Sequence, residues 1–164
     1  MAITKAKKGE VLAKIEDALA KASSAVFVHF NKLSVADTSA MRKALKGEGI
    51  GYFVAKKTLL RRALEKRGYT GEMPELQGEI ALAWSEGDAT APARGVFEHV
   101  KKHKDALAIA GGIFDSAYAD AARMTEIATI PPLPVLRGMF VNVINSPIQG
   151  LVIALDKIRE KKAA

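Results

Sequence analysis

The sequence contains no cysteine and few aromatic side chains, which make up only 6% of its 164 residues. Without cysteine it forms neither disulfides nor thiolate metal sites, so zinc fingers are excluded and a reducing compartment is expected. The basic first residues lead into no apolar run typical of a secretory signal. We also expect no membrane span, because no stretch approaches the roughly 20 apolar residues that a span needs. We therefore expect a soluble, cytoplasmic protein.

Arrangements of residues that would support catalysis are also scarce. His99 and His103 lie four apart beside Glu98, but a third metal ligand is not evident, so a solvated helix face is the simpler interpretation. Gly111-Gly112 precedes neither a phosphate-binding lysine nor a third glycine, and we interpret it as a bulge or turn. Since no nucleophile and base can be paired, the sequence predicts no enzymatic activity, no cofactor and no small-molecule substrate.

Positive charge is abundant, and it is concentrated toward one end of the chain. The net charge is +7, and residues 1–70 alone carry 15 lysine and arginine residues against 6 acidic ones, a net +9. Residues 71–135 carry −5, and residues 136–164 carry +3. This asymmetry indicates a polyanionic partner for the N-terminal part, although lysine-rich sequence is also common on solvated surfaces.

Short apolar segments alternate with segments of helical spacing over the first 132 residues. The apolar segments predict strands at 25–30, 50–55, 80–84 and 107–114. A helix is expected over about 9–22, and Ser34 with Asp37 has the spacing of a capping box that opens another. Taken alone, such alternation favours parallel βαβ units. We assign residues 1–132 to one globular α/β domain.

Residues 133–164 form a different kind of segment, an apolar helical tail behind a proline-rich stop. Asn145 would end one helix, while Ser146 and Pro147 would begin the next, so the tail is expected to be kinked or split. Partner helices would cover its apolar face, whereas a membrane surface is the alternative. The expected contacts recur at three- and four-residue steps: Leu136, Met139, Phe140, Val143, Ile144, Ile148, Leu151, Val152, Leu155 and Ile158.

The segment 54–63 gathers cations where a strand passes into a helix. With Thr58 as N-cap, Arg61 and Arg62 would occupy the first turn, where the helix dipole disfavours cations and a phosphate would relieve them. The alternative is that these side chains extend into water and bind nothing. Together with an unstructured N-terminal arm, the candidate RNA contacts are Lys5, Lys7, Lys8, Lys56, Lys57, Thr58, Arg61 and Arg62. Recognition of RNA shape and backbone is expected, rather than of base sequence.

The segment 56–63 and three other motifs along the chain resemble those of the bacterial ribosomal protein L-ten family, which forms the base of the large-subunit stalk. Lys56-Lys57-Thr58-Leu59-Leu60-Arg61-Arg62-Ala63 is similar to its K/R-N-T-L-x-R-x-A signature. The other three motifs lie at 41–49, 77–85 and 127–131. One departure is Lys57, which stands where the family usually has asparagine.

The resemblance implies an α+β fold: a compact two-layer domain with a four-stranded mixed sheet, followed by an extended, kinked helical tail. It also implies binding to large-subunit ribosomal RNA at the GTPase-associated centre, beside ribosomal protein L-eleven. The tail would carry dimers of the stalk protein L-seven/L-twelve, which recruit translational GTPases. A ribosome-assembly factor of the same fold is the alternative, but such a protein would not need an apolar tail.

Overall fold

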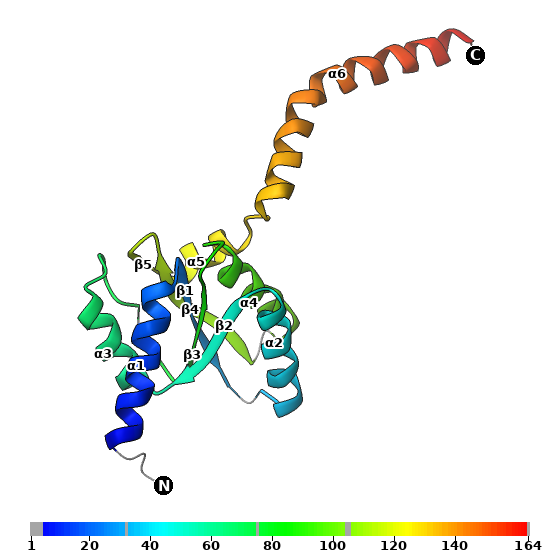
Figure 1. Cartoon of the computed structure of the whole chain (residues 1–164). Helices are drawn as coiled ribbons and strands as arrows, with labels where there is room; N and C mark the ends of the chain where they lie inside the picture. The colour runs from blue at the N-terminus through cyan, green and yellow to red at the C-terminus, as the bar shows by residue number, and fades with distance from the viewer. Residues whose placement is uncertain (1–4, 32, 75, 104–105, 164) are drawn as a thin grey trace. The chain divides into compact units, whose positions relative to one another are not determined.

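The computed structural model describes residues 5–31, 33–74, 76–103 and 106–163, and the side chains of 7–162 within these ranges (Figure 1). The chain divides into two compact units, Met1–Ile130 and Pro131–Ala164. Within the described residues, the first unit contains a sheet and five helices, and the second contains one long helix. We describe each unit by itself.

The sheet of the first unit has five strands in the order β2-β3-β1-β4-β5. Their bounds are β1 Ser24–Phe30, β2 Ile50–Ala55, β3 Glu79–Ser85, β4 Leu107–Phe114 and β5 Ala117–Ala119. Every pairing of these strands is antiparallel, and one parallel bridge joins Thr70, outside the strands, to Ala117 of β5. The α+β class is confirmed, but the sheet is antiparallel and five-stranded rather than mixed and four-stranded.

Two features of the sheet explain these differences. Strand β5 has three residues, too few for a periodic pattern, and it follows a tight turn in which Asp115 and Ser116 have φ angles of 52° and 62°. The alternation of strands and helices does mark two crossovers, β1–α2–β2 and β3–α4–β4, each joining strands that run the same way. Each crossover skips one position, which a strand of the opposite direction fills, as in a split βαβ unit.

Helices cover both faces of this sheet (Figure 1). Val26 and Val28 of β1 pack on one face with residues of α2, α4 and α5, whereas Phe27 between them packs on the other with residues of α1 and α3. Helices therefore cover both faces of the sheet, whereas the expected two-layer domain would have helices on one face only. The reason is that β1 is apolar at consecutive positions, so both its faces are buried. The helices are α1 Lys5–Lys21, α2 Val35–Gly47, α3 Lys57–Arg67, α4 Ala91–Lys102 and α5 Ala121–Ala128.

Two local predictions about this unit are confirmed. Ser34 is the N-cap of α2: its Oγ accepts a hydrogen bond from the backbone N–H of Asp37 at 3.1 Å. The register between β1 and β4 shifts next to Gly111, whose φ of 141° is open to glycine but strained for other residues. The double glycine is therefore a bulge within β4.

The second unit is a single helix, α6, which runs from Leu133 to Ala163 with Pro147 inside it. The predicted helix stop and the Ser146 N-cap are wrong, because the helix continues through both positions. A proline inside a helix removes one hydrogen bond and crowds the preceding turn, which bends the helix. Figure 1 shows α6 changing direction partway along its length, as expected for a kinked tail.

The length and apolar composition of α6 also correct an expectation about membranes. Over Leu133–Lys162 this helix is long and apolar enough to cross a bilayer, so the statement that no stretch approaches a span is wrong. Single helices of soluble proteins meet the same criterion, so it is weak evidence for insertion.

Candidate functional site

Strand directions bring the first turns of α1 and α3 to one end of the sheet. Both β1 and β2 pair antiparallel with β3, so they run the same way. Helix α1 ends at the start of β1 and runs back along the sheet, so α1 begins near the end of β1. Helix α3 begins directly after the end of β2, so both helices begin at the same end of the sheet. The two helices lie side by side (Figure 1), and Lys66 Nζ reaches Glu16 Oε1 at 3.0 Å. We call this end of the sheet the basic end.

The start of α3 differs from the predicted one. Lys56 is the N-cap and makes no side-chain capping bond, while its carbonyl accepts hydrogen bonds from the N–H groups of Leu59 and Leu60 at 2.9 and 3.1 Å. Thr58 is therefore the second residue of the helix and not its cap, and Lys57 lies in the first turn. Arg61 accordingly lies in the second turn, as does Arg62. Burial of Leu59, Leu60, Ala63 and Leu64 against the sheet decides this register.

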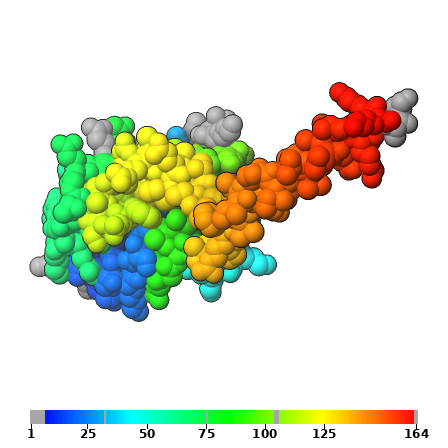
Figure 2. All heavy atoms as spheres, turned by 90° about the horizontal axis from the view of Figure 1, so that it is seen from above, coloured from blue at the N-terminus to red at the C-terminus, as the bar shows by residue number. Residues whose placement is uncertain are grey.

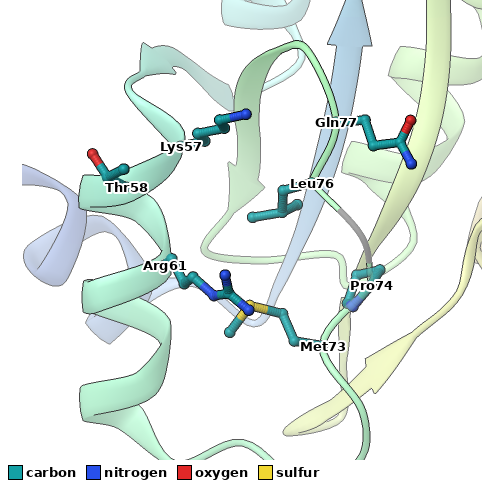
Figure 3. A pocket seen from close by; sticks show the side chains of 7 residues that line it. All are labelled: Lys57, Thr58, Arg61, Met73, Pro74, Leu76 and Gln77. Carbon is teal, nitrogen blue, oxygen red and sulfur yellow. The ribbon is translucent and has the colours of Figure 1, made fainter.

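Two clefts lie at the basic end, and Lys57 lines both of them. The first, of ≈ 400 Å³, lies between α3 and the segment that precedes β3 (Figure 3). Its lining residues are Lys57, Thr58, Arg61, Met73, Pro74, Leu76 and Gln77. The second, of ≈ 490 Å³, lies at the strand ends and is lined by Phe30, Val54, Ala55, Lys56, Lys57, Gly78, Glu79 and Ile80. Three of the predicted cations, Lys56, Lys57 and Arg61, thus surround adjoining clefts.

The arginines of α3 are exposed and weakly held. Arg61 Nε lies 3.5 Å from Glu65 Oε1, and the two side chains are 69% and 60% exposed. A surface pair of this kind contributes about 0–1 kcal/mol, so a phosphate can compete for Arg61. Arg62 is exposed and lines neither cleft.

The predicted N-terminal arm is helical from Lys5 onward, so the described part of it is not unstructured. Lys7 and Lys8 are exposed in the first turn of α1, which begins at the basic end. The side chain of Lys5 lies outside the described residues. The helix is amphipathic: Ile15 and Leu19 are buried in the core beneath it, and Val11 and Leu12 are half-buried against that core.

The aromatic residues near the basic segment, and His99, belong to the globular unit and not to the clefts of the basic end, except Phe30, which lines the second cleft. Phe30, Tyr52 and Phe53 are half-buried against the two core clusters, which agrees with a core role rather than base stacking. The guanidinium of Arg42 lies 5.5 Å from the centroid of the Tyr52 ring.

Burial lowers the pKa of His99 below its ordinary value of 6.5, and the charge of Lys102 lowers it further. Among the described residues, no three His, Asp or Glu side chains are grouped as metal ligands would be.

The ten apolar residues predicted for the tail are all exposed, from 38% for Leu136 to 71% for Val143. Figure 2 shows the side chains of α6, in orange and red, and the described part of the tail contains no other helix or strand to cover them. Four further apolar residues of α6, Leu133, Val135, Val141 and Ile153, are between 50% and 63% exposed. Apolar side chains therefore extend around much of the circumference of α6 rather than along a single stripe.

An internal repeat in α6 relates Val141 to Ile153. Residues 136–144 read L-R-G-M-F-V-N-V-I and residues 148–156 read I-Q-G-L-V-I-A-L-D, so Gly138 corresponds to Gly150 and Val141 to Ile153. The offset of about 12 residues corresponds to about 18 Å along a helix. Pro147 stands between the copies. Comparing the two halves of the tail could have revealed this repeat from the sequence, whereas a search for periodicity alone does not. We call the two copies apolar unit 1 (136–144) and apolar unit 2 (148–156).

Comparison with known proteins gives matches along nearly the whole chain. The family described as Ribosomal protein L10 matches residues 3–101. The Large ribosomal subunit protein uL10 of Clostridium acetobutylicum is 32% identical over 157 residues, covering 96% of this chain and 93% of that protein. The protein of the same name from Pediococcus pentosaceus is 34% identical over 158 residues, covering 96% and 94%. That of Staphylococcus carnosus is 32% identical over 160 residues, covering 98% and 95%.

Proposed function

Since this chain belongs to the ribosomal protein L10 family, we propose that it forms the base of the stalk on the large ribosomal subunit. It is a structural protein of the cytoplasmic ribosome and not an enzyme. Its globular unit binds large-subunit ribosomal RNA at the GTPase-associated centre, beside ribosomal protein L-eleven. Its tail carries dimers of the stalk protein L-seven/L-twelve.

The observation that carries the RNA-binding part is the grouping of exposed cations at the basic end. Lys56, Lys57 and Arg61 surround two adjoining clefts, and Lys7 and Lys8 extend the positive charge onto the first turn of α1. Lysine and arginine bind phosphates by charge, and arginine adds paired hydrogen bonds. Because these cations lie on two neighbouring helices, they suit a folded RNA surface better than a single isolated anion.

The exposed apolar side chains of α6 support the partner-binding part. Two copies of one apolar unit, separated by Pro147, suit two equivalent partners better than one. Amphipathic partner helices would bury these side chains, which are otherwise exposed to water. Several mobile partners held on one tail raise the local concentration of the domains that recruit translational GTPases, and this tethering needs no catalytic group.

Truncation after Asn145 tests the division between the two units. The truncated protein retains apolar unit 1 and lacks apolar unit 2, so we expect one bound stalk dimer in place of two, with RNA affinity unchanged. Native mass spectrometry of the purified complex counts the dimers, and filter binding measures RNA affinity. Equal loss of both activities would contradict the division.

Two alternatives make different predictions. An assembly factor of the same fold would be present on precursor subunits and absent from translating ribosomes, whereas a stalk base is present on both in one copy. A membrane surface is the other alternative, for which the length and apolar composition of α6 are weak evidence. Flotation of the full-length protein with anionic vesicles, in the presence and absence of the stalk protein, distinguishes membrane binding from stalk assembly.

A further inference from the structure

The first cleft at the basic end combines apolar walls with charged edges. Met73, Pro74 and Leu76 form one side, while Lys57, Thr58 and Arg61 of α3 form the other (Figure 3). Figure 3 shows Arg61 reaching from α3 toward Met73, so the guanidinium lies near an apolar wall as well as near solvent. Phosphate alone does not need apolar walls of this kind.

The walls of the cleft are fixed by the fold. Met73 and Leu76 pack against the core cluster beneath α1 and α3, and buried leucines anchor α3 itself. Pro74 packs over the bulge in β4: a Cβ on Gly111 would come within 2.8 Å of Cγ of the proline ring. The bulge thus makes room for the wall, and the cleft does not depend on a bound ligand to form it.

A nucleobase matches this combination of size and chemistry. The volume of ≈ 400 Å³ is at the small end of the range for ligand pockets, which is about 300–1,000 Å³. A base has two apolar faces, which Met73 and Pro74 can contact, and polar edges that side chains such as Thr58 can hydrogen-bond. Its sugar-phosphate lies outside the stack, where Lys57 and Arg61 stand.

The second cleft indicates that the ligand is part of a chain and not a free nucleotide. It adjoins the first through Lys57 and adds Lys56, so cations continue beyond the space that one nucleotide fills. A continuing phosphate backbone would meet these cations in succession. Bases that leave a helical stack at loops and bulges are the ones that proteins bind in such pockets.

We propose that the cleft between α3 and the wall of Met73, Pro74 and Leu76 receives one unstacked base of the bound RNA, while Lys57 and Arg61 hold the phosphates on either side of it. This inference rests on the proposed function, because it concerns the same RNA. It goes beyond recognition of the RNA backbone, because the cleft would require one nucleotide at a fixed position in the RNA to be unpaired.

Filling the cleft without changing its charge tests the proposal. Met73→Trp places a larger apolar side chain in the wall, and Thr58→Trp does so from an exposed position on α3 where folding is less at risk. Val35→Trp, at a site that is 84% exposed on α2, is the matched control. Each protein is tested with a transcribed fragment of large-subunit ribosomal RNA spanning the GTPase-associated centre.

Two measurements are made on each complex: affinity as a function of salt, and reactivity of each unpaired base toward dimethyl sulfate or carbodiimide. We expect the wild type and the control to protect one unpaired base. The filled variants should expose that base again, with RNA affinity roughly five- to tenfold lower and the salt slope unchanged, since the phosphate contacts remain.

Three other outcomes overturn the proposal. Wild-type affinity and protection in both filled variants would show that the cleft holds no base, while leaving RNA binding intact. Lower affinity without a change at any single nucleotide would show a general disturbance of the surface. If the wild type binds no ribosomal RNA, the proposed function fails first and the base site with it.

Discussion

Phe27 and Phe140 illustrate how differently the two units use the same kind of side chain. Phe27 lies between helix and sheet with an exposed fraction of 0%, whereas Phe140 on α6 is 67% exposed. In the globular unit, apolar side chains stabilise the fold that positions the cations. In the tail, they form the surface itself. Substitutions of one type should therefore change stability in one unit and binding in the other.

Matched leucine truncations give the largest contrast. Leu60→Ala removes a fully buried side chain from α3 and should lower the free energy of unfolding by about 2–5 kcal/mol. Leu151→Ala, at a position 63% exposed, should change it by less than about 0.5 kcal/mol but weaken stalk-dimer binding. Urea unfolding followed by the fluorescence of Trp84, the sole tryptophan, measures the globular unit. Similar losses of stability in both variants would contradict this contrast between the units.

Charge reversal separates the cations of the two units. Lys57→Glu with Arg61→Glu should lower RNA affinity roughly 100-fold at low salt and reduce the salt slope by about one unit for each phosphate that is no longer neutralised. Lys157→Glu with Arg159→Glu makes the same change in charge on the tail and should leave RNA binding close to wild type. Filter binding over a range of salt concentrations measures both. An unchanged slope in the first variant would count against phosphate binding at the basic end.

The two predicted serine caps provide a smaller contrast. Ser34 Oγ accepts from the N–H of Asp37 at 3.1 Å and donates to its carboxylate at 2.6 Å, so Ser34→Ala should cost about 1 kcal/mol. Ser146 lies inside a continuous helix, and alanine there should keep or slightly raise the helical content. Urea unfolding and circular dichroism give the two readouts. A loss of helix in Ser146→Ala would mean that this serine caps a separate helix after all.

The smallest expected effect is the pH dependence that His99 contributes. Its folded-state pKa is lowered below 6.5 by burial and then by Lys102, so the unfolded chain takes up the proton more readily than the folded one. The stability that the neutral imidazole provides is present above the unfolded pKa and is lost as the pH falls through the folded one. Between pH 7.5 and 5, wild-type stability should therefore fall more than that of His99→Gln. Parallel pH curves for the two proteins would exclude this contribution.

Local features were predictable to within a residue in places. The bounds of β2 and β4 match the predicted segments, and the α2 cap and the β4 bulge were identified from spacing and from a glycine pair. These features depend on interactions over a few residues. Thr58 shows the limit of such reasoning: it has the chemistry of a cap, but burial of Leu60 and Leu64 against the sheet sets where α3 begins.

The sequence by itself determined the order of the four longer strands, the positive charge of the first 70 residues and the repeated apolar units of the tail, because each depends on neighbours along the chain. Only the tertiary structure decided that α1 and α3 begin at one end of the sheet, and that Met73, Pro74 and Leu76 face α3 across a cleft. The two helices share an end because β1 and β2 both pair antiparallel with β3, and Pro74 lies in the wall because it packs over Gly111 of β4. These partners lie at least 25 residues apart along the chain, beyond the reach of local periodicity.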